Sequence, residues 1–213
     1  MARPREFDRT HVLDQAMRVF WEHGYDGASI SALTSSMGIN SPSLYMAFGS
    51  KEALFQEVLH HYHESREAHR VWTSKGRTAR EVAERMLYGS TAWLTDPAEP
   101  KGCLLVQCSL ASKPTGKHPG TTPADRHAGI ASWLSKRFAQ GQREGDLDPA
   151  VDTRELGSYI YSIFCGLAIR AAAGESQAAL KKTVDRAMLA WPSNDQTATR
   201  KKLSVPGAGK KKA

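Results

Sequence analysis

Two glycines bound the segment that decides the fold, Gly38-Ile39-Asn40-Ser41-Pro42-Ser43-Leu44-Tyr45-Met46-Ala47-Phe48-Gly49. Glycine readily adopts the left-handed conformation with which many helices end. Ser41 followed by Pro42 predicts an N-cap with proline at the first helical position. The segment therefore predicts a short helix that begins soon after a sharp turn at Gly38 and ends at Gly49.

Two other short helices precede this segment. The first has apolar residues at helical spacing, and Gly24 predicts its end. Ser29 predicts the N-cap of the second, which ends at Gly38. The side chains expected to form the common core are Leu13, Ala16, Phe20, Leu33, Leu44 and Phe48. Three short helices joined by tight turns match a helix-turn-helix, whose last helix enters the major groove of duplex DNA.

The outward face of that third helix is small and polar. Hydroxyls and backbone N–H groups at a helix N-terminus suit phosphate oxygens, and the Tyr45 hydroxyl can reach a phosphate. Met46 and Ala47 can meet thymine methyl groups. Lys51, in the next helix, is placed for a phosphate. Three further cations predict a flexible basic arm at the N-terminus: Arg3, Arg5 and Arg9.

The run Leu44-Tyr45-Met46-Ala47-Phe48-Gly49-Ser50-Lys51-Glu52-Ala53-Leu54-Phe55 resembles the N-terminal domain of the tetracycline-repressor (TetR-like) family of bacterial regulators. The similarity covers about the first 60 residues, and a weaker similarity extends from Gly141 to Gly166. It implies an all-α protein, in which a three-helix helix-turn-helix domain joins a larger helical bundle for ligand binding and dimerisation. Carried over by position, the resemblance implies DNA contacts at Ser29, Ser41, Ser43, Tyr45, Met46, Ala47 and Lys51.

The rest of the chain also has helical periodicity. Ser50 predicts the N-cap of a long helix with Glu52 in its first turn. Further helices are expected over about 78–94 and 102–112, up to about Gly145, from Asp152 to about Ala173, and up to Trp191. The expected domains are residues 1–50 for DNA binding, 51–191 for ligand binding and dimerisation, and 192–213 as a basic disordered tail.

The last two helices, residues 152–191, are the expected homodimer interface. They have broad apolar stripes, and small side chains let helices approach closely. The small residues are Gly157, Gly166, Ala168, Ala171 and Ala172. The alternative is that these positions pack within one chain.

A small, largely apolar effector is expected to bind between the bundle helices. Its binding is expected to shift the long helix that starts at Ser50 and so to change the spacing of two helix-turn-helix domains on DNA. The candidate lining residues are Met86, Tyr88, Trp93, Leu104, Gln107, Cys108, Trp133, Phe138, Tyr159 and Phe164. Ordinary core packing is the alternative for each of them.

Other functions are weighed against this one. Cys103 follows a glycine near a helix N-terminus, where the pKa of a thiol can fall, so a thiol sensor of oxidants or electrophiles is one alternative. A helical interaction module with a basic tail is another. An enzyme is not expected, because no Walker A, HExxH or GxSxG motif is present. No cofactor is implied, and the histidines near residue 60 do not form a convincing metal site.

Composition agrees with a folded protein of the cytoplasm. Hydrophobic residues make up 40% and charged residues 24% of the 213 residues. No apolar run approaches the roughly 18 residues that a membrane-spanning helix needs, and the charged N-terminus predicts no signal peptide. Much of the net charge of +7 lies in residues 192–213, which carry six Lys and Arg against one Asp. The DNA-binding prediction therefore rests on motifs, not on overall charge.

Overall fold

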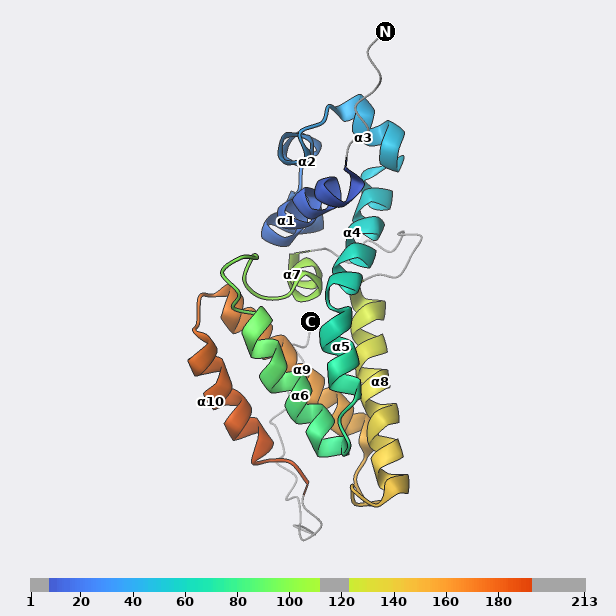
Figure 1. The fold of residues 1–213 in the computed structure, drawn as a ribbon, viewed down its shortest axis with the longest axis vertical. Helices are drawn as coiled ribbons and strands as arrows, with labels where there is room; N and C mark the ends of the chain where they lie inside the picture. Colours follow the sequence, from blue (N-terminus) through green and yellow to red (C-terminus); the bar gives the residue numbers. More distant parts are fainter. Residues whose placement is uncertain (1–7, 112–122, 193–213) are drawn as a thin grey trace, which may run out of the picture.

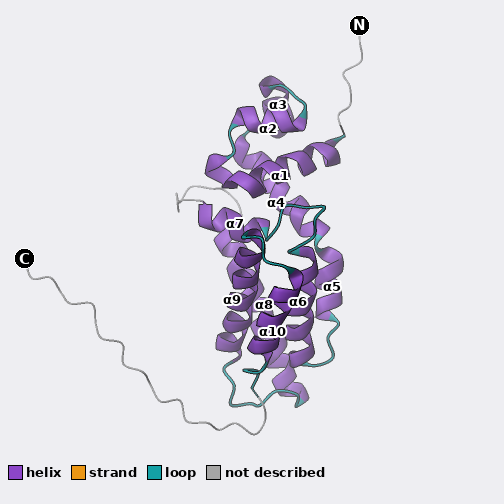
Figure 2. Cartoon of the chain, turned by 90° about the vertical axis from the view of Figure 1, so that its left-hand side faces the viewer, coloured by secondary structure: helices purple, strands orange, loops and turns teal. Residues whose placement is uncertain are grey.

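The computed structural model describes residues 8–111 and 123–192, and every regular element in these ranges is a helix (Figures 1 and 2). The predicted all-α fold is confirmed for this part of the chain. Arg3, Arg5 and the basic tail lie outside the described residues. None of the described helices is long and apolar enough to cross a membrane.

Three helices form the N-terminal unit: α1 (Arg9–Gly27), α2 (Ile30–Met37) and α3 (Ser41–Phe48). Their core is the predicted one, because Phe20, Leu33 and Leu44 are fully buried together. Gly24 interrupts α1 as predicted, because its backbone is non-helical, with a φ of 67° and a ψ of 178°. A short helical stretch beyond this kink carries α1 to Gly27.

The caps of α2 and α3 explain the sharp turn between them. Ser29 Oγ accepts a hydrogen bond from the Ala32 amide at 3.0 Å, as predicted for an N-cap. The N-cap of α3 is Asn40 and not Ser41, because Asn40 Oδ1 accepts from the Ser43 amide at 2.8 Å. Gly38 ends α2 in the left-handed conformation, with a φ of 65°.

Helices α4 (Lys51–Ser65) and α5 (Glu67–Ser74) run from the N-terminal unit into the bundle (Figure 1). Ser50 caps α4 by accepting a hydrogen bond from the Ala53 amide at 3.0 Å. The helical path breaks at Arg66, which has non-helical backbone angles. This break marks the place where the N-terminal end of the molecule meets the bundle (Figure 1).

The bundle contains α6 (Ala79–Trp93), α8 (Pro123–Glu144), α9 (Thr153–Ala172) and α10 (Gln177–Met188). Helix α7 (Leu104–Ala111) lies between the bundle and α1 (Figure 1). Helices α8 and α9 pack against each other, and Gly157 lies where they approach closely. A Cβ atom at this glycine would lie 3.0 Å from the carbonyl oxygen of Ala131, so a larger residue would force the two helices apart.

Candidate DNA-binding surface and effector cavity

Helix α3 is anchored on one side and open to solvent on the other. Leu44 and Phe48 are buried, and α3 packs against α2 and α4. One residue after Leu44, Tyr45 is 48% exposed, and Met46 is 86% exposed. A methionine that is so exposed gains nothing from packing within the chain, so this face is available to a partner.

The other predicted DNA contacts surround these two residues. Ser41, Ser43 and Ala47 are half-buried on α3, whereas Ser29 is exposed at the start of α2. Lys51 is half-buried, and its Nζ lies 4.6 Å from the centroid of the Tyr25 ring. Burial lowers the pKa of Lys51, while the carboxylates of Asp26 and Glu52 oppose that shift.

Arg9 does not belong to a flexible arm. It is the first residue of α1, and its guanidinium donates to the carboxylate of Glu57 at 2.6 Å. Its Cζ also lies 4.6 Å from the centroid of the Phe48 ring. Arg9 therefore ties α1 to α3 and α4, which the sequence alone did not indicate.

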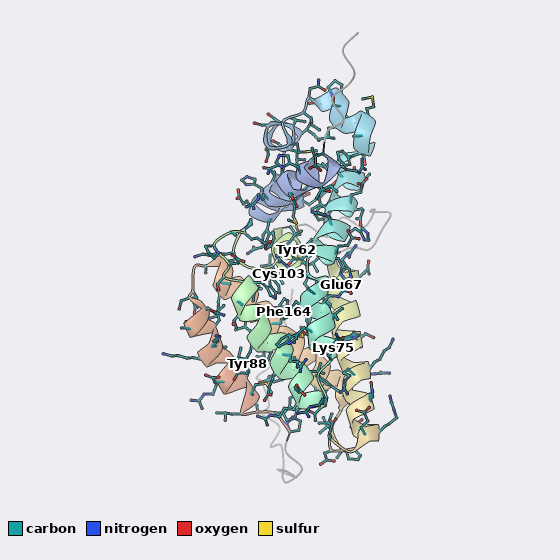
Figure 3. The ribbon with its side chains drawn as sticks, viewed as in Figure 1. Tyr62, Glu67, Lys75, Tyr88, Cys103 and Phe164 are labelled. Carbon is teal, nitrogen blue, oxygen red and sulfur yellow. The ribbon has the colours of Figure 1, made fainter. Side chains whose placement is uncertain are left out.

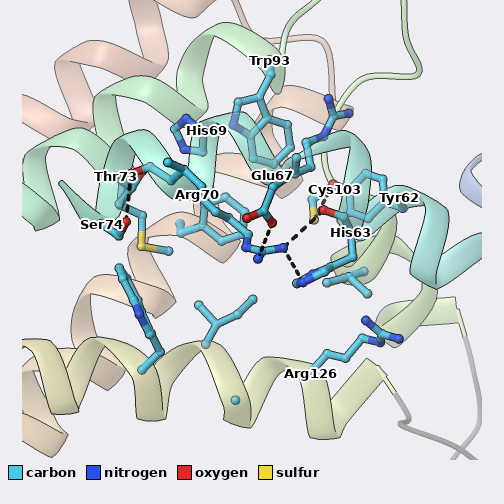
Figure 4. Close-up of a pocket in the computed structure, with 18 of the residues that line it drawn as sticks. Tyr62, His63, Glu67, His69, Arg70, Thr73, Ser74, Trp93, Cys103 and Arg126 are labelled. Atoms are coloured by element: carbon cyan, nitrogen blue, oxygen red, sulfur yellow. Dashed lines mark hydrogen bonds and ion pairs between the residues drawn. The ribbon is translucent and has the colours of Figure 1, made fainter.

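A cavity of about 610 Å³ lies at the junction of α4, α5, α6, α8 and α9 (Figures 3 and 4). Its apolar wall includes four of the ten predicted ligand-binding residues: Met86, Trp93, Trp133 and Phe164. The rings of Trp93 and Phe164 lie 5.9 Å apart and pack at an angle. This volume suits a small organic ligand, since ligand pockets usually measure about 300–1,000 Å³.

The other six candidates lie outside the cavity lining. Tyr88 points toward α10, where its hydroxyl donates to Asp185 at 2.6 Å (Figure 3). Phe138 packs edge-on against Trp191, with ring centroids 5.5 Å apart. Leu104 and Cys108 are fully buried core residues. Gln107 is half-buried, and Tyr159 is partly exposed on α9.

Sequence analysis missed the charged side of the cavity. His63, Arg66, Glu67 and Arg70 line it from α4, the break and α5. Their spacing of three and four residues was the available signal, because it places them on one helical face. Arg126 lines the cavity from α8, on the side where His63 and Arg70 lie (Figure 4).

Arg66 connects the cavity to its surroundings. Its guanidinium forms an ion pair with Glu99 and stacks on three aromatic rings. Its Cζ lies 5.8 Å from the centroid of Trp21 in α1, 5.1 Å from that of Tyr62 in α4 and 4.8 Å from that of Trp93 in α6. Arg66 therefore contacts the N-terminal unit and the cavity wall at the same time.

Cys103 does not have the environment of a reactive thiol. It is buried, and the Tyr62 hydroxyl donates to its Sγ at 3.3 Å. Burial raises the pKa of the thiol, and this effect outweighs nearby hydrogen bonds that lower it. The expectation of a lowered pKa at this helix start is wrong, because Cys103, although it lines the cavity, is desolvated by burial.

The fold and the exposed α3 define a helix-turn-helix protein of the DNA-binding class. A family model described as "Bacterial regulatory proteins, tetR family" matches residues 12–58. The HTH-type transcriptional repressor ComR of Escherichia coli (strain K12) is 30% identical over 192 residues, which cover 89% of this chain and 91% of ComR. The chain belongs to the tetR family of bacterial regulatory proteins. It is thus a transcriptional regulator and not an enzyme.

Solved structures of the TetR family transcriptional regulator CifR share this fold. One is a cysteine mutant complexed with 26bp double-strand operator DNA. It is 37% identical to this chain, with a TM-score of 0.83, and the match covers 89% of this chain and 100% of that chain. The similarity extends over the bundle as well as the helix-turn-helix, so the predicted two-part architecture is confirmed.

Proposed function

We propose that the protein is a transcriptional repressor that binds a pseudo-palindromic operator as a homodimer and leaves it when a small molecule enters the bundle cavity. One observation carries the proposal: Arg66 contacts Trp21 of the helix-turn-helix unit and also lines the cavity. ComR is described as a repressor, and the CifR structure contains operator DNA, so both support this assignment.

The proposed DNA surface consists of the outward residues of α3 and their neighbours. Tyr45 would place its hydroxyl on a phosphate, while Met46 and Ala47 would contact base edges. Lys51 would pair with a phosphate, and its position over Tyr25 limits where its ammonium can lie. The complete proposed set is Arg3, Arg5, Ser29, Ser41, Ser43, Tyr45, Met46, Ala47 and Lys51.

The proposed dimer interface is formed by α9 and α10. Tyr159 and Ile169 of α9 are partly exposed, and Leu189 after α10 is 74% exposed. Gly166 has open space around the position of a Cβ atom, so a partner helix could approach it. Gly157 and Ala168 have another role, because they pack inside one chain.

Release from DNA would follow a shift between two arrangements of the break at Arg66. A ligand beside Trp93 and Arg66 would favour one arrangement, and α4 would carry the change to α3. Two recognition helices must meet major grooves about 34–36 Å apart on one face of DNA. A coupling free energy of about 1–3 kcal/mol would reduce operator affinity roughly 5–150-fold.

The test is selection of bound fragments from random duplexes, followed by titration of the selected site. We expect a pseudo-palindromic site and saturation by one dimer. Tyr45→Ala should lower affinity for this site without changing the dimer. Failure to discriminate any duplex from bulk competitor DNA would reject the proposal. Salt-sensitive binding without sequence preference would instead favour an interaction module with a basic tail.

A further inference from the structure

We infer that the cavity takes an amphipathic organic anion: an aromatic or aliphatic body that bears one carboxylate. This inference rests on the proposed function, because it names the chemical class of the effector for the same cavity. It follows from a division of the cavity lining into an apolar wall and a cationic rim, which consists of Arg70 and Arg126 with the imidazole of His63 beside them.

The apolar wall determines the body of the ligand. Trp93 and Met86 come from α6, Phe164 from α9, and Ile130 and Trp133 from α8. Aromatic and thioether side chains pack well against flat or branched hydrocarbon groups. A highly charged or sugar-like ligand would leave these surfaces in contact with polar groups, so the wall selects a hydrocarbon body.

The cationic rim determines the head group. Burial lowers the pKa of His63 on α4, and the charges of Arg70 and of Arg126 on α8 lower it further. Figure 4 shows Arg126 on the same side of the cavity as His63 and Arg70. Two arginines from separate helices, Arg70 of α5 and Arg126 of α8, thus lie on one side of the cavity, where both charges would attract a carboxylate.

Two acidic residues, Glu67 and Asp125, also line the cavity. Glu67 forms an ion pair with Arg70, and Arg66, which also lines the cavity, pairs with Glu99 outside the lining. Asp125 has an interaction of its own. The Nε atom of Arg126 is buried without a hydrogen-bond partner, and burial lowers the pKa of this arginine.

A neutral ligand would bury Arg126 further without pairing it, which costs free energy. A carboxylate would accept charge-assisted hydrogen bonds from its guanidinium, and these are about twice as strong as neutral ones. The carboxylate would therefore sit at Arg126, with His63 and Arg70 nearby. The hydrocarbon body would extend toward Trp93 and Phe164.

The experiment compares acids with their amides, which have nearly the same shape but no charge. The pairs are 2-naphthylacetate and 2-naphthylacetamide, 4-phenylbutyrate and its amide, and octanoate and octanamide. Calorimetric titrations at pH 7 use the full-length wild type, Arg126→Gln and Arg143→Gln. Arg143 is an exposed arginine on the same helix, so its substitution is the matched control.

We expect at least one acid to bind roughly tenfold more tightly than its amide. Arg126→Gln should reduce that ratio to less than about threefold, and Arg143→Gln should leave it unchanged. The inference is overturned if no acid binds, if the amides bind equally well, or if the preference survives Arg126→Gln.

Operator release, measured with the same compounds, separates this inference from the proposed function. An acid that binds through Arg126 but leaves the operator complex intact would support the ligand class and contradict release by that ligand. Release by the amides at the same concentrations as the acids would support the regulator and overturn the ligand class. The two proposals therefore fail in different ways.

Discussion

At the break between α4 and α5, the guanidinium carbon of Arg66 lies 4.8 Å from the centroid of the Trp93 ring at the end of α6. Trp93 belongs to the cavity wall, and the other contacts of Arg66 reach Trp21 in α1. A ligand that displaces the Trp93 ring must therefore disturb a side chain that also packs on the DNA-binding unit. This relationship gives the proposed allosteric coupling a physical route that can be tested.

Arg66→Met should weaken the coupling between the effector cavity and the DNA-binding surface. The substitution retains an unbranched side chain but removes the ion pair with Glu99 and the cation–π contacts, so we expect the free energy of unfolding to fall by about 1–3 kcal/mol. Operator affinity without ligand should change little, while release by an effector should weaken severalfold. Gel-shift titrations with and without effector measure both quantities.

Glu99→Gln is the control for that variant, because it removes the ion pair and leaves Arg66 in contact with the three rings. If the coupling between the cavity and the DNA surface depends on the contacts of Arg66 with the aromatic rings, Glu99→Gln should retain most of the effector-induced release from the operator. Normal release by Arg66→Met would contradict a role for Arg66 in transmission.

Tyr45 and Leu44 are neighbours with opposite exposure, and they should respond oppositely to alanine. Tyr45→Ala should weaken operator binding by about 1–3 kcal/mol if it removes a specific contact, with little effect on the melting temperature. Leu44→Ala should destabilise the fold by about 2–5 kcal/mol, because it leaves a cavity in the core. Thermal unfolding and fluorescence-anisotropy titrations distinguish the two effects. Unchanged operator affinity in Tyr45→Ala would remove this residue from the proposed contacts.

Ile169→Glu should separate the dimer. This residue is 44% exposed on α9, so a carboxylate there is tolerated in the monomer but is costly inside an apolar interface. Sedimentation velocity should show a shift to monomer, and circular dichroism should show retained helix content. Met46→Glu is the control, because it adds the same charge at the exposed face of α3. A dimeric Ile169→Glu variant would place the interface elsewhere.

Local rules predicted the DNA-binding unit well. The N-cap at Ser29 and the left-handed conformation of Gly38 each depend on residues close in sequence. Both can therefore be predicted without knowledge of the tertiary structure. Even there, Asn40 replaced Ser41 as the cap, because two adjacent polar residues can both serve and the backbone selects one. The predicted core residues Leu33 and Leu44 followed from helical periodicity.

The cavity could be predicted only in part because it combines residues from distant segments. Trp93 and Phe164 were found as large apolar residues in helices, a criterion that also selected Phe138, which packs against Trp191 instead. Arg66 and Arg126 were missed because charged residues at helical spacing usually face solvent. That Arg66 and Arg126 line a cavity becomes apparent only when α5, α6 and α8 are placed together in the fold.

Stability should fall as the pH drops from neutrality, and His69 should account for part of this. Burial lowers the pKa of His69 below the ordinary value of 6.5, and the charge of Arg66 lowers it further. Burial also lowers the pKa values of His127 and His63. The unfolded chain therefore binds more protons than the folded chain below about pH 6.5, so protonation favours unfolding there.

His69→Asn should reduce this dependence, because asparagine does not titrate. The full stabilising contribution of neutral His69 is present above pH 6.5 and is lost as the pH falls toward its lowered pKa. Chemical unfolding between pH 7.5 and pH 5.0 measures the slope, which should be shallower in His69→Asn than in wild type. His23→Gln, at an exposed position on α1, is the control and should keep the wild-type slope. An unchanged slope in His69→Asn would show that other groups set the acid sensitivity of the bundle.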